Sequence, residues 1–145
     1  MADTILDEKE IFNGKFFDLW MNSSKKGSVK TASAESSLKE EEVAIAGQLG
    51  NGSVITGATG SGSLGFHEVN DSLLKEINDC VKLGKPFYFD LITQNTNQST
   101  GKYKRVKITN CKITKFKPID CDITKLLEST YDFTYNPSNV DIEMN

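Results

Sequence analysis

The stretch GQLGNGSVITGATGSGSLGFHEV, residues 47–69, decides how the chain is interpreted, because it holds seven of the eleven glycines. Glycine brings no side chain to a core and costs backbone entropy, so a dense run of it indicates positive φ angles or very close backbone approach. We interpret the stretch as an extended loop that runs into a strand at 60–69. Two functions would explain it: a cradle for a phosphate, or a backbone packed against another protein chain.

The residues that follow this stretch carry the one clear helical pattern. Apolar residues recur there at i, i+3/i+4 and i+7/i+8 spacing, at Leu73, Leu74, Ile77 and Val81. Asn70 or Asp71 can cap the start of this helix, and Gly84 followed by Pro86 ends it. We expect a single amphipathic helix that packs on a sheet face or closes the end of a sandwich.

The residues that precede the glycine stretch predict strands and a projection. KFFDLWMN at 15–22 and the run 28–38 resemble the two arms of a β-hairpin joined by a polar turn. The second arm has few large apolar side chains, so it should face water or a neighbouring subunit. Residues 39–59 begin with KEEE and contain little that could pack on their own domain. We therefore expect a long protruding segment there.

The C-terminal half adds further strands. Residues 86–93 alternate in polarity, 94–101 form a polar turn, and 124–135 are the last expected strand. Along 103–117 the apolar parity changes, which predicts bulges. Residues 136–145 are interpreted as a polar tail. Together these elements predict one domain, residues 1–145, that is mainly β: an antiparallel β-sandwich or barrel with one flanking α-helix.

Composition limits the classes of function. The chain has 145 residues and a formal charge of −3, which gives no overall basic field to attract nucleic acid. It contains no apolar run near the roughly 20 residues of a membrane helix, and its first residues, MADTILDEKE, have no apolar signal core. We expect folding in a cytoplasm and no stable membrane association. Cys80, Cys111 and Cys121, with His67 the single histidine, predict free thiols and no zinc site.

The motifs that could carry chemistry are weak. Residues 60–65 match GxGxxG, but a strand follows where a dinucleotide site needs a helix. No lysine follows to make a phosphate-binding P-loop. His67 and Glu68 would point to opposite faces of a strand. We therefore assign no catalytic, cofactor-binding or metal-binding residues and expect no enzyme. The alternative that stays open is a small monomeric or oligomeric binding module that uses the glycine-rich loop 57–65 for a nucleotide or another ligand.

Charge is segregated along the second half. Lysine and arginine fill 102–117 with no acid among them, and acidic residues dominate 120–143. One interpretation is a nucleic-acid-binding strand with Tyr103 or Phe116 stacked on bases. The other, which the acidic total charge favours, is that the basic strand pairs with an acidic one within the subunit or across a subunit boundary.

A family resemblance rests on VKTASAESSLKEEEVAIAG followed by GNGSVITGATGSGSLGFHEVNDSLLKEI. Together they resemble the tail tube proteins of contractile phages and of phage-tail-like bacteriocins from Gram-positive bacteria, and the likeness runs from about Gly14 to Tyr135. In that family a TGATGSGS-like segment leads into a strand and then the single helix. The resemblance implies hexameric rings that stack into a hollow tube inside a contractile sheath. Strands of six subunits would line the channel, and the protruding segment would reach neighbouring subunits.

The tube architecture implied by the resemblance assigns residues to two surfaces. The expected inter-subunit contacts are Val43, Ile45, Leu49, Gly57, Gly60 and Gly62. The expected lumen-facing residues are Lys30, Ser33, Glu35 and Ser37. The implied partners are further copies of the chain, a sheath protein, and baseplate and tail-terminator proteins, with assembly in the host cytoplasm before release of a phage or phage-tail-like particle. The sequence leaves open whether the lumen carries DNA.

Overall fold

A computed structural model describes residues 7–68 and 72–144. Its strands are β1 (Phe17–Met21), β2 (Ser24–Lys25), β3 (Val29–Ala44), β4 (Asn51–His67), β5 (Tyr88–Thr96), β6 (Tyr103–Phe116), β7 (Glu128–Tyr135) and β8 (Val140–Met144). The helix α1 spans Leu73–Lys82, and two 3-10 turns span Glu8–Glu10 and Pro137–Asn139.

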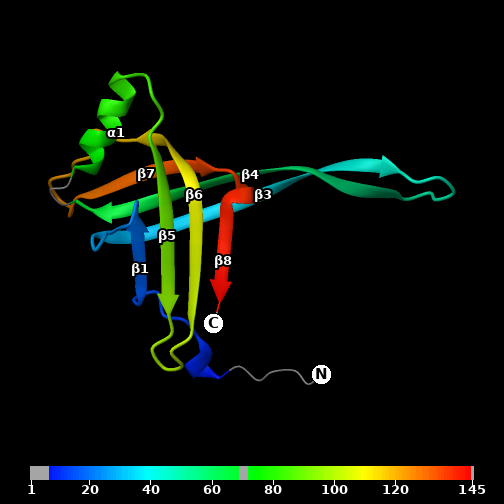
Figure 1. Cartoon of the computed structure of the whole chain (residues 1–145), viewed down its shortest axis with the longest axis horizontal. Helices are drawn as coiled ribbons and strands as arrows, with labels where there is room; N and C mark the ends of the chain where they lie inside the picture. Colours follow the sequence, from blue (N-terminus) through cyan, green and yellow to red (C-terminus); the bar gives the residue numbers. More distant parts are fainter. Residues whose placement is uncertain (1–6, 69–71, 145) are drawn as a thin grey trace.

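The strands form one antiparallel sheet that folds into two crossing layers. Its order is β2-β1-β5-β6-β7-β4-β3, and β8 pairs with β6. β6 holds the layers together: one edge pairs with β5, and the other pairs with β8 at 104–108 and with β7 at 112–116. In Figure 1 the layer β1-β5-β6-β8 runs across the layer β4-β3-β7, with α1 at one end. The expected β-sandwich with one flanking helix is confirmed.

Bulges let β6 serve both layers. The register shifts between Phe89 and Leu91 of β5, opposite a stretch of β6 in which Asn110 has a φ of 55°. It shifts again between Ile113 and Lys115, where β6 pairs with β7. Each extra residue bends the strand and turns the following side chains to the other face. The parity change in 103–117 therefore predicted a real feature.

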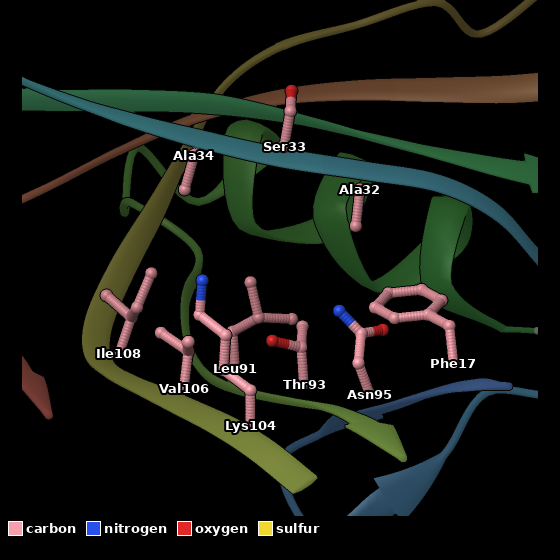
Figure 2. A pocket seen from close by; sticks show the side chains of 10 residues that line it. All are labelled: Phe17, Ala32, Ser33, Ala34, Leu91, Thr93, Asn95, Lys104, Val106 and Ile108. Atoms are coloured by element: carbon pink, nitrogen blue, oxygen red, sulfur yellow. The ribbon is translucent and has the colours of Figure 1, made fainter. Parts of the chain in front are cut away.

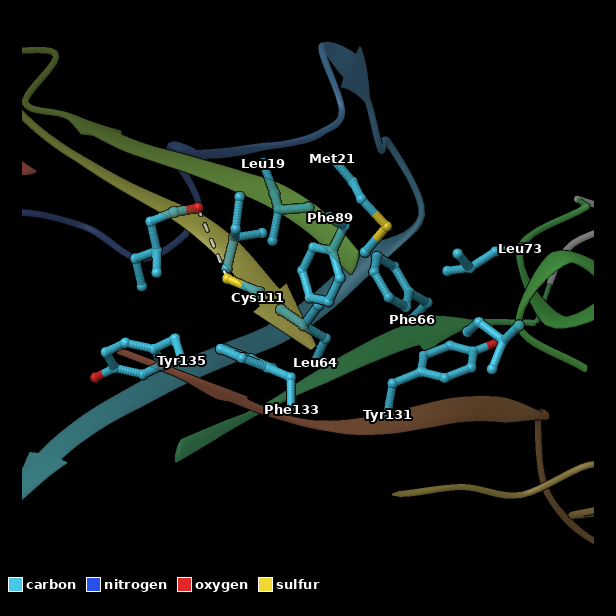
Figure 3. Close-up of a cluster of buried hydrophobic side chains, with 13 residues drawn as sticks. Leu19, Met21, Leu64, Phe66, Leu73, Phe89, Cys111, Tyr131, Phe133 and Tyr135 are labelled. Atoms are coloured by element: carbon cyan, nitrogen blue, oxygen red, sulfur yellow. Dashed lines mark hydrogen bonds between the residues drawn. The ribbon is translucent and has the colours of Figure 1, made fainter. Parts of the chain in front are cut away.

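The hydrophobic core lies between the layers and is closed by α1 (Figure 3). Its fully buried large side chains are Leu19, Leu64, Ile77, Phe89, Cys111 and Phe133. The Phe89 and Phe133 rings meet edge to face with centroids 5.7 Å apart, a favourable aromatic geometry. Both layers and the helix contribute side chains to this core, so neither layer buries its apolar face without the other.

The helix begins after Ser72 and ends in a Schellman motif. The Lys85 amide donates to the Cys80 carbonyl at 2.9 Å, the Gly84 amide donates to the Val81 carbonyl at 3.0 Å, and Gly84 has a φ of 71°. The glycine stop is confirmed, whereas the expected caps Asn70 and Asp71 lie outside the described residues.

Two predictions about the N-terminal half are wrong. Residues 15–22 and 28–38 do not form one hairpin: β1 turns at Asn22 and Ser23, both with positive φ, into the two-residue β2. β3 instead pairs along its length with β4. The glycine stretch is not a loop, because β4 already starts at Asn51. The polar turn after β1 was predicted correctly, but it leads into β2. β3 pairs with β4 instead, because β4 is fixed in the body by its pairing with β7.

The C-terminal segment holds an unexpected strand. Residues 136–145 were interpreted as a polar tail, yet Val140–Met144 form β8 on the edge of β6. The last expected strand, 124–135, starts only at Glu128. β8 covers an edge of β6 that would otherwise present unpaired backbone groups.

Candidate assembly surfaces

The outer part of the β3–β4 ribbon projects from the body (Figure 1). Ser36 pairs with Gly60, and Gly60 is the last residue of β4, counted outward from the body, that also pairs with β7. Residues 37–59, which we call the arm, make strand pairs only within their own ladder in the described part of the chain. At about 3.3 Å per residue the arm extends roughly 30 Å. The tip turns at Gly47, whose φ is 81°, with the Gln48 amide donating to the Ile45 carbonyl at 3.2 Å.

Large apolar side chains on the arm are uncovered. They are Leu38, Val43, Ile45, Leu49, Val54 and Ile55, and Leu49 is fully exposed. A lone two-stranded ribbon is only marginally stable in water, and exposed apolar side chains on it mark a binding surface. Val43, Ile45 and Leu49, predicted to contact another subunit, thus lie on the arm without cover from their own body. The contact itself stays a prediction.

The predicted interface glycines have different surroundings. A Cβ on Gly60 would stand 2.5 Å from the Tyr135 ring, and one on Gly62 would stand 2.6 Å from the Phe133 ring. Aromatic side chains of β7 therefore fill the space above both glycines, inside the subunit. The Tyr135 hydroxyl also bonds Ser36 Oγ at 2.8 Å, which anchors the ribbon where the arm leaves the body. Gly57 lies on the arm, where an added Cβ would stand 3.9 Å from the Cβ of Lys39.

The outer face of the β3-β4-β7 layer is lined by small polar side chains. Ser33, Ser63 and Asp132 form one cross-strand row, and the Oγ atoms of the two serines lie 3.3 Å apart. The next row is Glu35, Ser61 and Thr134. Figure 2 shows Ser33 pointing away from the space between the layers. We call this surface the hydroxyl face.

Three of the four predicted lumen residues, Lys30, Ser33 and Glu35, lie on the hydroxyl face, and Ser37 follows them as the first residue of the arm. Ser33, Glu35 and Ser37 alternate along β3 and are exposed. Lys30 is the extra residue of a bulge and pairs with Glu128, whose position on β7 places the ion pair on the same face. The hydrogen bond from Lys30 is the main cause that lowers the pKa of Glu128. That this face lines a channel stays a prediction.

The alternative of a ligand loop at 57–65 is wrong in its premise. These residues belong to β4, and 60–65 is paired with β3 on one edge and β7 on the other. Backbone amides committed to two ladders cannot cradle a phosphate. The described part of the chain also brings no three His, Cys, Asp or Glu side chains together as metal ligands.

The segregated charges meet within the subunit. The register sets Arg105 opposite Glu143 and Lys107 opposite Asp141, with β8 supplying the acids. Farther along β6, Lys115 faces Asp132 of β7. The interpretation that the basic strand pairs with acidic strands is confirmed. Sequence reasoning missed that the partner was the last segment, although its alternation V-D-I-E-M is a strand signal.

Solved structures define the class of fold. The chain superposes on the tube-terminating cap of the anti-feeding prophage with a TM-score of 0.77 and 11% identity, covering 99% of this chain and 97% of that one. It superposes on a chain of the sheath–tube complex of PVC, an extracellular contractile injection system, with a TM-score of 0.68 and 13% identity, covering 95% and 93%. The fold is that of tube and cap subunits of contractile systems.

The family follows from the sequence itself. Residues 4–144 match the phage tail tube protein family, and the chain belongs to that family. It is 29% identical over 138 residues to the phage-like element PBSX protein XkdM of Bacillus subtilis strain 168, covering 93% of both chains. The chain is thus a tail structural protein, as the resemblance predicted. No helix in residues 7–68 or 72–144 has the length and apolar content to cross a membrane.

Proposed function

We propose that this chain is the subunit of an inner tail tube, in which hexameric rings stack into a hollow conduit inside a contractile sheath. The observation that carries the proposal is the arm, a long ribbon whose apolar side chains have no cover from their own subunit. Contact between an arm and the body of another copy is heterologous, and such contacts grow rings and filaments.

Ring closure is supported by the free edge of β3. The inner part of β3, residues 29–36, pairs with β4 on one edge. Its other edge has no strand partner among the described residues. A long exposed edge invites strand pairing unless it is covered, and pairing with the next subunit in a ring would cover it. The hydroxyl face would then line the lumen, with Lys30, Ser33, Glu35 and Ser37 at its surface. Small side chains on that face suit a smooth wall.

The proposed partners come from the contexts of the structural neighbours. One neighbour sits in a sheath–tube complex, another in a sheath/tube terminator, and a third in a baseplate. We propose equivalent sheath, terminator and baseplate contacts for this chain. Assembly in the host cytoplasm, release of a phage or phage-tail-like particle and passage of DNA through the lumen belong to the same proposal. No catalytic step is part of it.

A second candidate role is the cap that terminates a tube. It is favoured by one observation, the TM-scores of 0.77 and 0.75 to cap and terminator structures. A cap forms a ring but has no surface on which a further ring can stack. A tube subunit forms a ring and can also bind another ring on each side.

Negative-stain electron microscopy of the purified protein over a range of concentration and salt separates these roles. Stacked six-fold tubes are the expected result. Single six-fold rings that never stack would favour the cap. Discrete small particles that persist after sheath and baseplate proteins are added would overturn both proposals.

A further inference from the structure

The layer β1-β5-β6-β8 extends past its crossing with β3 and leaves part of its inner face uncovered. A groove of about 220 Å³ lies there, roofed on one side by Ala32 and Ala34 of β3 (Figure 2). Leu91 and Ile108 form its deep end, and Lys104 stands at its outer end. We call this surface the groove.

The strand register continues the floor of the groove onto β8. One cross-strand row is Leu19, Thr93, Val106 and Ile142, and the next is Phe17, Asn95, Lys104 and Met144. Exposure rises along the first row from 0% at Leu19 to 62% at Ile142. Met144, at the end of the second row, is also exposed. The face that starts as core therefore ends as an open surface of mixed character. Val106, Ile142 and Met144 are its apolar side chains, and Thr93, Asn95 and Lys104 lie beside them.

On the opposite face of the same strands, the charged side chains have partners within the subunit. Lys25 bonds Asp18 at 3.2 Å and lies 5.9 Å from the centre of the Trp20 ring. Arg105 donates to Gln94 Oε1 at 2.8 Å. Charged side chains that have partners are stable in water, whereas exposed apolar side chains such as Ile142 and Met144 on the other face are more stable when covered.

The arm has the complementary chemistry. Glu41 and Val43 alternate along β3 and so share one face of the ribbon, and the Ile45 side chain lies against Gly52, the cross-strand partner of Val43. This arm face therefore presents an acid followed by two exposed aliphatic side chains. The groove presents Leu91, Val106 and Ile108 beside Lys104, with Thr93 and Asn95 as polar neighbours. The arm runs away from its own body, so it cannot enter its own groove (Figure 1).

We propose that the groove receives the arm of a neighbouring copy, with Val43 and Ile45 against the apolar side chains of Val106 and Ile142 and Glu41 beside Lys104. The inference rests on the proposed tube function and adds the receiving surface to it. It assigns β8 a purpose beyond covering the edge of β6, because Ile142 and Met144 widen the floor. Opposite charges at the end of an apolar contact set its direction and register.

Disulfide trapping between two populations tests the contact. Both carry Cys80→Ser and Cys121→Ser; one also carries Val43→Cys in the arm, and the other Val106→Cys in the groove. Mixed, assembled and oxidised, they should give a cross-linked pair containing one of each. The matched control replaces Val106→Cys by Lys107→Cys, the next residue on β6, which faces the opposite side and should give at least about tenfold less product.

Charge exchange supplies a second measurement. Lys104→Glu should raise the concentration needed for half assembly by about tenfold, and adding Glu41→Lys should recover most of that loss. Tubes that form normally without the Val43–Val106 cross-link and without sensitivity to Lys104→Glu would overturn the groove while leaving the tube function intact. Failure of the unmodified protein to assemble would overturn the tube function and the groove with it.

Discussion

The inner and outer parts of the β3–β4 ribbon share one ladder but have opposite surroundings. In the inner part, 29–36 and 60–67, β4 is paired on both edges, and Leu64 and Phe66 are buried. In the arm, 37–59, each strand has one partner and the apolar side chains are exposed. Pairing alone therefore does not fix the role of a strand. The inner part stabilises the subunit, and the arm is available for assembly.

Truncation of one leucine in each part should give the largest contrast in stability. Leu64→Ala removes a side chain with 0% exposure and should lower the free energy of unfolding by about 3 kcal/mol. Leu49→Ala, at the tip of the arm, should change it by less than about 0.5 kcal/mol. Urea unfolding at a concentration below assembly measures both. Equal losses would mean that the arm packs on its own body in solution.

Glycine substitutions sharpen the same comparison at smaller magnitude. Gly62→Ala would press a methyl group against the Phe133 ring and the Ser33 carbonyl, and should cost about 2 kcal/mol. Gly57→Ala adds a methyl group with ordinary clearance from Lys39 and should be neutral or slightly stabilising. The midpoint of thermal unfolding reports both changes. A neutral Gly62→Ala would contradict the close packing of β4 against β7.

Thiol chemistry offers a local contrast that is confined to alkaline pH. Burial, and secondly the charge of Asp90, raises the pKa of the Cys111 thiol to about 12. The folded state therefore keeps this proton after the unfolded chain loses it, and the contribution of Cys111 is complete below about pH 8.5. From there to pH 12 the free energy of unfolding should fall by up to about 1.4 kcal/mol per pH unit through this group. Cys111→Val should lack that part of the slope.

Alkylation at pH 8.5 checks the same burial without unfolding. In the Cys80→Ser, Cys121→Ser background, Cys111 should stay unmodified while a Leu49→Cys thiol on the arm reacts freely. Rapid labelling of Cys111 in the folded protein would show that the body opens as readily as the arm.

Local sequence patterns predicted much of the fold but less of the assembly surfaces. The stripe from Leu73 to Val81 with the stop at Gly84 predicted α1, and the parity change along β6 predicted its bulges. The partner of β3 was not predictable locally, because it depends on side chains such as Leu64 and Phe66 whose burial requires β7 and the other layer. The strand β8 left a signal in the alternation of Val140, Ile142 and Met144, but its acidic residues made it look like a tail.

The site residues divide in the same way. Polar residues on β3 indicated an exposed face. The structure places Lys30, Ser33 and Glu35 on the hydroxyl face and Ser37 next to it, at the start of the arm. At two of the predicted interface glycines, the need for a small residue has a cause inside the subunit. Gly60 and Gly62 look like residues freed for a neighbouring chain, but the rings that need their space belong to β7 of the same chain. A sequence shows that a glycine is needed without showing what approaches it.

One arm variant, Ile45→Asp, allows folding and assembly to be measured together. A carboxylate at this exposed position costs the isolated subunit little but would be buried in a contact between copies. We predict a free energy of unfolding within about 0.5 kcal/mol of the unmodified chain, together with the absence of tubes in electron micrographs. Normal tubes from Ile45→Asp would contradict the claim that the arm is the assembly element.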